Sequence, residues 1–129
     1  SVVTWGDARW GGDSGLVRGS IAENVARLAR TDAAFAAVKR DGSAVSWGDP
    51  AWGGDCSLVQ ESLRAGVAQV EGTSSAFAAV KVDGSVVTWG DALFGGRSER
   101  VRALLAGGVV QVASTFSAFA AVKMDGSVV

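Results

Sequence analysis

The sequence lacks histidine and tyrosine entirely, and it contains one cysteine, Cys56, and one proline. Histidine is the commonest general base and a frequent metal ligand, so its absence leaves few side chains for catalysis. A single cysteine forms no disulfide within the chain. We therefore predict no catalytic residue, no cofactor and no metal ion, and we expect that this chain is not an enzyme.

The sequence also lacks an excess of charge and any long hydrophobic run. Its 12 Lys and Arg residues balance 13 Asp and Glu residues and are scattered, which argues against nucleic acid as a partner. Gly, Ser, Asp or Arg interrupts every apolar run before about 18 residues, so no membrane insertion is expected. No targeting segment is recognisable, so the localisation stays open between a soluble protein and a cell-surface or extracellular fibre. With 48% hydrophobic residues, the 129-residue chain is expected to fold.

The dominant feature is an internal repeat. The stretch "AFAAVKRDGSAVSWGD" at 34–49 recurs as "AFAAVKVDGSVVTWGD" at 76–91, and a third copy starts at 118. A fixed period of this kind is typical of stacked structural units. We predict repeat units at 1–42, 43–84 and 85–126, with 127–129 opening a fourth. Two aromatic columns keep the 42-residue spacing and are the predicted anchors of the repeat: Trp5, Trp47 and Trp89, and Phe35, Phe77 and Phe119.

Each unit carries signals for strands, a turn and a short helix. Strand-like runs flank an Asp-Gly pair, which favours a hairpin with a type I′ turn and makes its glycine a third kind of anchor: Gly42, Gly84 and Gly126. After a Gly-rich loop, Ser57–Gln60 matches a capping box, and Gly66 suits a left-handed helix end. Asn24 and Gly108 occupy the place of Gly66 in the other units. A further strand, such as "VAQVE", precedes the hairpin. The small Ala residues of "AFAAVK" permit close approach of another layer, so both faces of the hairpin are expected to be largely covered.

The predicted fold class is therefore a β-rich repeat protein with α+β units. Each of its three 42-residue repeats should hold about three strands and one short helix. The units should stack as an open propeller-like arc or a solenoid, because a single unit buries too little apolar surface alone.

The segment "VAQVEGTSSAFAAVKVDGSVVTWGD" at 67–91 resembles the repeat of the regulator-of-chromosome-condensation family. That repeat combines an apolar strand, a small-residue hairpin with Asp-Gly, and a strand ending in Trp-Gly before a Gly-rich loop. The chain is closer still to tandem 42-residue "VVTWGD…GGDSS…AFAA…DGS" arrays in long microbial proteins. The resemblance implies propeller-like blades, but three short units do not make a closed ring of about four to eight blades. No residues match the loops with which founding members act on a small GTPase or chromatin, so neither activity is implied.

The Gly-rich loops offer one aromatic side chain each. Two interpretations are open: these rings pack between units, which we favour, or they form a ladder that contacts a sugar or a peptide. The residues concerned are Trp10, Trp52 and Phe94.

Polar columns in the loops receive structural interpretations. Asp7 and its counterparts Asp49 and Asp91 flank the loops and resemble calcium ligands, but Arg97 replaces a further loop Asp in the third unit. We expect the loop carboxylates to accept hydrogen bonds from nearby backbone N–H groups. The lysines that end the hairpin strand, such as Lys81, are expected to form a solvated, charge-balanced edge.

Together these features favour a non-enzymatic structural repeat scaffold, which is part of a longer array or of a head-to-tail filament. The expected partner is the chain itself, because "SVV" at 1–3 and at 127–129 leaves both ends in the same repeat phase without a polar capping unit. The alternative is a propeller-like module that binds a protein or a glycan through its loops.

Overall fold

A computed structural model describes all 129 residues and shows a β-rich chain with three small antiparallel sheets. The first sheet has the strand order β1-β2-β3, the second β4-β5-β6, and the third consists of β7 and β8. Consecutive strands are neighbours, so each sheet is a simple meander. The strands are β1 (Val25–Arg30), β2 (Ala34–Lys39), β3 (Ala44–Gly48), β4 (Val67–Gly72), β5 (Ala76–Lys81), β6 (Val86–Gly90), β7 (Val109–Ser114) and β8 (Phe119–Lys123).

The predicted burial of both hairpin faces is confirmed in β2 and β5, whereas Ala120 of β8 is exposed. Successive side chains of a strand point to opposite faces of the sheet. In β5, Phe77 and Ala78 are neighbours in sequence, and their exposed fractions are 0% and 1%. Ala36 in β2 is likewise fully buried. Small alanine side chains at these positions allow another layer to approach closely.

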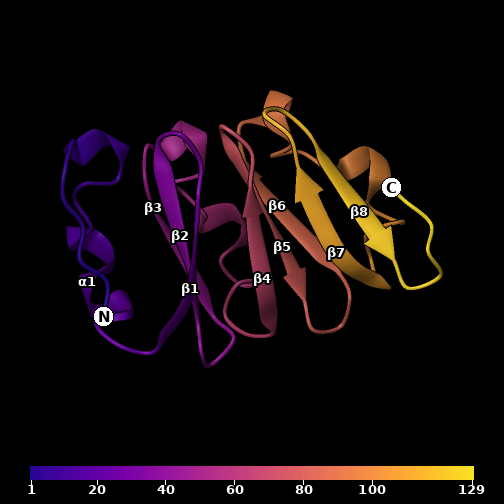
Figure 1. Ribbon diagram of the computed structural model, residues 1–129, viewed down its shortest axis with the longest axis horizontal. Coiled ribbons are helices and arrows are strands. Elements are labelled where there is room, and N and C mark those ends of the chain that lie inside the picture. Colours follow the sequence, from indigo (N-terminus) through magenta and orange to yellow (C-terminus); the bar gives the residue numbers. More distant parts are fainter.

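The sheets pack on one another through apolar clusters. The largest cluster joins Ala36 of the first sheet to Phe77 and Trp89 of the second. The next joins Ala78 of the second sheet to Ala121 of the third. One face of each sheet therefore packs against the opposite face of the following sheet. Figure 1 shows the three sheets side by side along the longest axis, with the two termini at opposite ends.

The hairpin turns differ from the predicted type I′ turn. The N–H of Gly42 donates to the carbonyl of Lys39 at 3.0 Å, and the N–H of Lys39 donates to Ser43 at 2.8 Å. Gly42 has a φ of +85°, whereas Asp41 is not among the residues with positive φ. A type I′ turn needs positive φ at both central residues. The prediction is wrong because Arg40 and Asp41 are the central residues of a type I turn, and Gly42 forms the bulge that follows it.

The predicted short helix of each unit forms as an α-helix in the first unit alone. One α-helix is present, and it has four residues; every other helical element is a three-residue 3₁₀ turn. These elements are η1 (Ala8–Trp10), η2 (Gly15–Val17), α1 (Arg18–Ile21), η3 (Pro50–Trp52), η4 (Ser57–Val59), η5 (Ala92–Phe94) and η6 (Glu99–Val101).

The local hydrogen bonds explain why no longer helix forms. The N–H of Ser57 donates to the Asp55 carboxylate at 2.9 Å, and Ser57 does not occupy the N-cap, so the predicted capping box is absent. The N–H of Leu63 reaches the carbonyl of Val59 at 3.2 Å, which closes a single helical turn. Starting a helix is costly, and Gly66 ends the segment before propagation can offset that cost.

The predicted left-handed residue after the helical turns is confirmed. The φ angle is +62° at Asn24, +73° at Gly66 and +75° at Gly108. Immediately after Gly66, the N–H of Val67 donates to the carbonyl of Gly42 at 2.8 Å. The left-handed residue therefore directs the chain into β4 and ties that strand to the hairpin turn of the preceding sheet.

The lysines at the hairpin ends have a role that the sequence did not predict. The ammonium group of Lys81 donates a hydrogen bond to the carbonyl of Ser62, and that of Lys123 donates to the carbonyl of Leu104 at 2.6 Å. Carbonyls at the end of a helical turn lack intrahelical partners and carry partial negative charge, so a cation stabilises them.

The boundaries of the predicted sequence units fall inside the hairpin turns. Residues 42 and 43 lie between β2 and β3, and residues 84 and 85 lie between β5 and β6. Each three-stranded sheet therefore takes its last strand from the following sequence unit.

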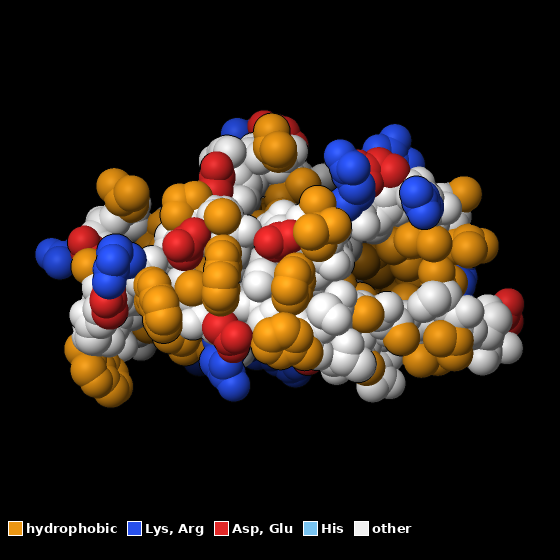
Figure 2. All heavy atoms as spheres, turned by 90° about the horizontal axis from the view of Figure 1, so that it is seen from above, with side chains coloured by type: hydrophobic (Ala, Val, Ile, Leu, Met, Phe, Trp, Pro, Cys, Tyr) orange, Lys and Arg blue, Asp and Glu red, His pale blue; other side chains and the backbone are white.

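Large apolar side chains also remain on the surface, among them Leu16 and Leu58. Figure 2 shows hydrophobic groups spread among charged ones over one face.

Candidate functional site

The best-defined arrangement of side chains in the molecule is the tryptophan contact between successive sheets. Trp89 belongs to β6 of the second sheet, is 4% exposed, and donates its indole N–H to the carbonyl of Gly53 at 3.1 Å. Gly53 lies in the loop that follows the first sheet. Trp47 in β3 makes the same contact one period earlier, since it is 5% exposed and donates to Gly11 at 3.2 Å.

A phenylalanine completes each tryptophan contact. Phe77 lies directly opposite Trp89 in the neighbouring strand, and their ring centroids are 5.3 Å apart. Phe35 and Trp47 repeat this pair at 5.6 Å. A Cβ atom on Gly53 would lie 2.6 Å from the Phe77 ring, and the φ of Gly53 is +100°. Glycine is therefore required where the loop meets the aromatic pair.

The other predicted anchors differ in their surroundings. Trp5 is 84% exposed. Phe119 is partly buried, and a Cβ atom on Gly95 would lie 2.5 Å from its ring. The hairpin glycines have φ angles of +85° at Gly42, +81° at Gly84 and +85° at Gly126. A Cβ atom would lie 2.9 Å from the nearest backbone nitrogen at Gly42 and 2.6 Å from it at Gly84, whereas Gly126 has open space.

The loop aromatics are more exposed than the tryptophans of the strands. Trp10 is 57% exposed and Trp52 is 37% exposed. Phe94 is partly buried, and its ring packs edge-on against Phe116 at a centroid distance of 5.9 Å. Packing within the molecule therefore accounts for Phe94, while Trp10 and Trp52 keep ring surface that a ligand could contact.

The loop carboxylates accept backbone hydrogen bonds, as predicted. Asp7 and Asp49 each accept a backbone N–H two residues further on at 2.9 Å. The Arg9 guanidinium also bonds Asp7 and holds the pKa of that carboxyl below its ordinary value. The N–H of Ser57 likewise lowers the pKa of Asp55. No group of three or more His, Cys, Asp or Glu side chains lies close enough to hold a metal ion.

The hairpin turns contain a second set of bonded carboxylates. Asp83 accepts the Ser85 hydroxyl at 2.6 Å and the Ser85 N–H at 2.9 Å. The serine hydroxyl is the main reason that the pKa of Asp83 lies below its ordinary value. The same geometry recurs at Asp41 and Asp125, so these carboxylates stabilise turns.

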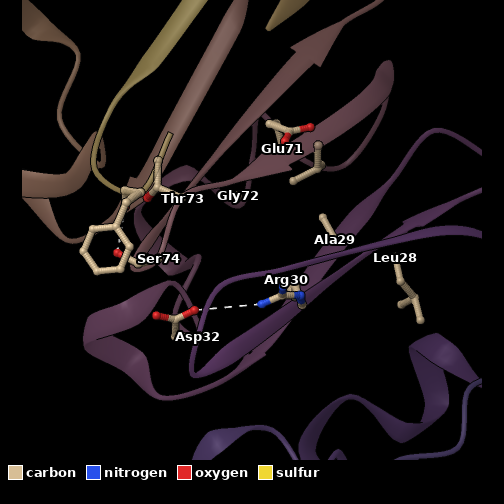
Figure 3. Close-up of a pocket in the computed structure, with 10 residues that line it drawn as sticks. Leu28, Ala29, Arg30, Asp32, Glu71, Gly72, Thr73 and Ser74 are labelled. Carbon is tan, nitrogen blue, oxygen red and sulfur yellow. Dashed lines mark hydrogen bonds and ion pairs between the residues drawn. The ribbon is translucent and has the colours of Figure 1, made fainter. Parts of the chain in front are cut away.

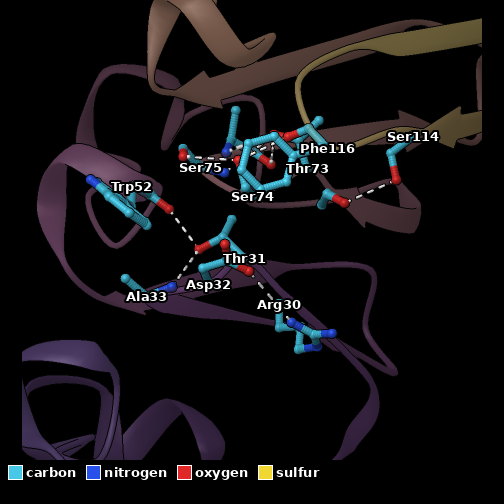
Figure 4. Close-up of polar contacts among 12 residues, drawn as sticks. Arg30, Thr31, Asp32, Ala33, Trp52, Thr73, Ser74, Ser75, Ser114 and Phe116 are labelled. Atoms are coloured by element: carbon cyan, nitrogen blue, oxygen red, sulfur yellow. Dashed lines mark hydrogen bonds and ion pairs between the residues drawn. The ribbon is translucent and has the colours of Figure 1, made fainter.

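Sequence reasoning missed a polar column at the turns between β1 and β2, between β4 and β5, and between β7 and β8. The N–H of Asp32 donates to the carbonyl of Ser74 at 2.8 Å, and the N–H of Ser74 donates to Phe116 at 3.0 Å. Figure 4 shows the adjoining threonines, of which Thr31 donates to the carbonyl of Trp52 at 2.9 Å and Thr73 to that of Phe94 at 2.9 Å. The identity of Thr31, Thr73 and Thr115 across the period was the available signal.

A polar groove runs beside this column (Figure 3) and has a volume of about 440 Å³. Arg30 and Asp32 face each other across 3.9 Å at its edge, and both side chains are at least half exposed. Glu71 accepts the hydroxyl of Ser114 at 2.9 Å. The groove offers hydrogen-bonding groups of both charges, but its ionisable side chains already have partners within the chain.

No protein-family model matches the chain, and no curated protein matches it either. None of its helices is long and apolar enough to cross a membrane. The contacts described above join one sheet to the next.

Proposed function

We propose that this chain is a non-enzymatic structural repeat scaffold. Its β-rich units stack in one direction as an open propeller-like arc or solenoid, within a longer array or a head-to-tail filament. The observation that carries the proposal is the repeated tryptophan contact. Trp47 and Trp89 each donate to a glycine carbonyl 36 residues earlier in the chain, at 3.2 and 3.1 Å, so the same contact, which we call the joint, recurs in the same register.

The backbone supports the same reading. The chain of hydrogen bonds from Asp32 to Ser74 and from Ser74 to Phe116 links equivalent turns of all three sheets. Each sheet packs on its neighbour in the row, and the termini lie at opposite ends (Figure 1). Repeat proteins built from such nearest-neighbour contacts extend without a change in the contact itself.

The test is the assembly state of the chain in solution. Sedimentation velocity and multi-angle light scattering over a wide concentration range should show species whose mass grows with concentration. Negative-stain imaging of the same samples should show particles that lengthen along one axis. A single species of monomer mass at every concentration would contradict the filament, and would direct attention to the loops.

The second candidate is a protein- or glycan-binding module. It is favoured by the exposed rings of Trp10 and Trp52, which lie at equivalent places in consecutive loops. The test is a glycan array probed with the parent chain and with a Trp10→Ala/Trp52→Ala variant. Capture that is lost in the variant, while its thermal unfolding stays unchanged, would support binding through these loops.

A further inference from the structure

An apolar groove opens at the end of the molecule that holds β7 and β8, and its volume is about 170 Å³. Figure 2 shows a hollow lined by hydrophobic groups toward this end. The face of the second sheet contributes Ala78 and Val86, the third sheet contributes Phe119 and Ala121, and the intervening segment contributes Gly95 and Leu105.

This groove is a second copy of the site that holds Trp89. The residues one period earlier are Ala36, Ala44, Gly53, Leu63, Phe77 and Ala79, and five of these six match the groove in residue type. All except Gly53 belong to the apolar cluster that surrounds Trp89, and Gly53 accepts its indole N–H. The groove therefore has the lining that buries an indole elsewhere in the same chain.

The opposite end of the molecule presents such an indole. Trp5 is 84% exposed, although it occupies the same place in the repeat as Trp89. We propose that the groove beside β8 binds Trp5 of a second copy of this chain. This inference rests on the proposed head-to-tail assembly and assigns the residues that form its joint.

The segment that carries Trp5 is already held like an inner strand. The N–H of Val2 donates to the carbonyl of Ile21 at 3.1 Å, as that of Val86 donates to Leu105 at 3.0 Å in β6. The Thr4 and Ser14 hydroxyls are 2.9 Å apart, and the Thr88 and Ser98 hydroxyls repeat this distance. Little ordering of this segment is needed on docking, which favours association.

The edge of β8 accepts this segment as its neighbour. In the second sheet, Phe77 and Ala78 pair with Trp89 and Thr88 of β6. In the third sheet, Ala121 exchanges both backbone hydrogen bonds with Val129, and the pairing extends to Val122 and Val128. The corresponding partners of Phe119 and Ala120 in the docked pair are Trp5 and Thr4 of the second copy.

The incoming strand replaces a segment of identical sequence. Residues 1–3 and residues 127–129 are both Ser-Val-Val. The second copy can therefore take the place of 127–129 without loss of their side-chain contacts, and it adds the indole and the Thr4 pairing. Because different surfaces meet at the two ends, the contact is heterologous and generates a ring or a filament.

Disulfide trapping tests this docking. Ala121 and Val129 form a hydrogen-bonded pair, so the next pair, Ala120 with Thr4 of the second copy, is non-hydrogen-bonded. Its expected Cα separation of about 4.5 Å lies within the range of disulfides. We would combine Thr4→Cys and Ala120→Cys with Cys56→Ser, which is the residue at that place in the other units.

The expected result is a ladder of covalent multimers on a non-reducing gel, and about tenfold less product when Trp5→Ala is added. The matched control replaces Thr4→Cys by Val3→Cys. Val3 is 76% exposed, but it points to the opposite face of the strand and should not link to Ala120. Because the N-terminus and β8 lie toward opposite ends of the molecule (Figure 1), intramolecular bonding does not compete.

The outcomes separate this inference from the proposed function. Large species of the parent chain without selective linkage of residue 4 to residue 120 would overturn the docking mode but would still support the proposed scaffold function. Selective, Trp5-dependent linkage in a chain that stays monomeric by scattering would support the docking and overturn the filament. Equal linkage by the Val3→Cys control would also overturn the docking.

Discussion

Replacing Trp89 by alanine tests the joint between sheets most directly. The side chain is 4% exposed, lies 5.3 Å from Phe77 between ring centroids, and donates to the Gly53 carbonyl. An aromatic side chain buries roughly 150–250 Å², which contributes about 4 to 6 kcal/mol at about 25 cal/mol per Å². Partial collapse of the neighbours recovers some of this, so we expect Trp89→Ala to lower the free energy of unfolding by about 3 to 5 kcal/mol.

Urea denaturation followed by far-UV circular dichroism measures this change. The matched control is Trp5→Ala, which alters the same place in the repeat at a side chain that is 84% exposed. At protein concentrations too low for assembly, the control should change stability by less than about 0.5 kcal/mol. Equal losses in the two variants, or a loss below about 1 kcal/mol in Trp89→Ala, would refute the packing argument.

Two further changes probe the close contacts and the turns. A Cβ atom at Gly72 would lie 2.0 Å from the Arg30 carbonyl oxygen of the preceding sheet, so Gly72→Ala should destabilise the fold by about 2 kcal/mol or more. Gly19→Ala in α1 meets nothing within 4 Å and should be neutral or stabilising; equal thermal shifts in the two would contradict the clash. The lowered pKa of Asp83 contributes stability above its unfolded-state value, and this contribution is lost as the pH falls through the folded-state pKa. In an NMR titration, Ser85→Ala should raise the pKa of Asp83 toward its ordinary value, and an unchanged pKa would count against the turn bond.

The strands and the left-handed positions could be predicted from sequence because their signals are local. The repeated Ala-Phe-Ala-Ala-Val-Lys run forms β2 and β5, and Asn24 and Gly66 have the positive φ that few other residues tolerate. The turn type could not be read from the Asp-Gly pair alone, since the same pair fits a type I turn with a bulge. The sequence pattern of a capping box at Ser57 also could not show that the Ser57 N–H donates to the Asp55 carboxylate instead.

The candidate site was predicted in its residues but not in its geometry. Sequence identity makes Trp5 and Trp89 equivalent, yet one is 84% exposed and the other 4%. The difference arises because Trp89 packs against residues of earlier units, such as Ala36 and Leu63, so its own unit does not determine its burial. The bond from Trp89 to Gly53 was equally invisible, since a glycine carbonyl carries no side-chain signal.

The contact that Trp89 makes between sheets sets no limit on how many repeat units can follow one another. The indole of Trp89 needs only a glycine carbonyl, a phenylalanine neighbour and an alanine face, and every period supplies these groups. A second copy supplies them as well as the next unit of the same chain does. The rotation between successive sheets is then what decides between a ring and a filament, because a constant rotation closes only when it divides a full turn. Ala36 and Ala78 are buried between sheets, and their small side chains let the sheets approach closely, so in the proposed assembly larger residues at these positions should change its curvature.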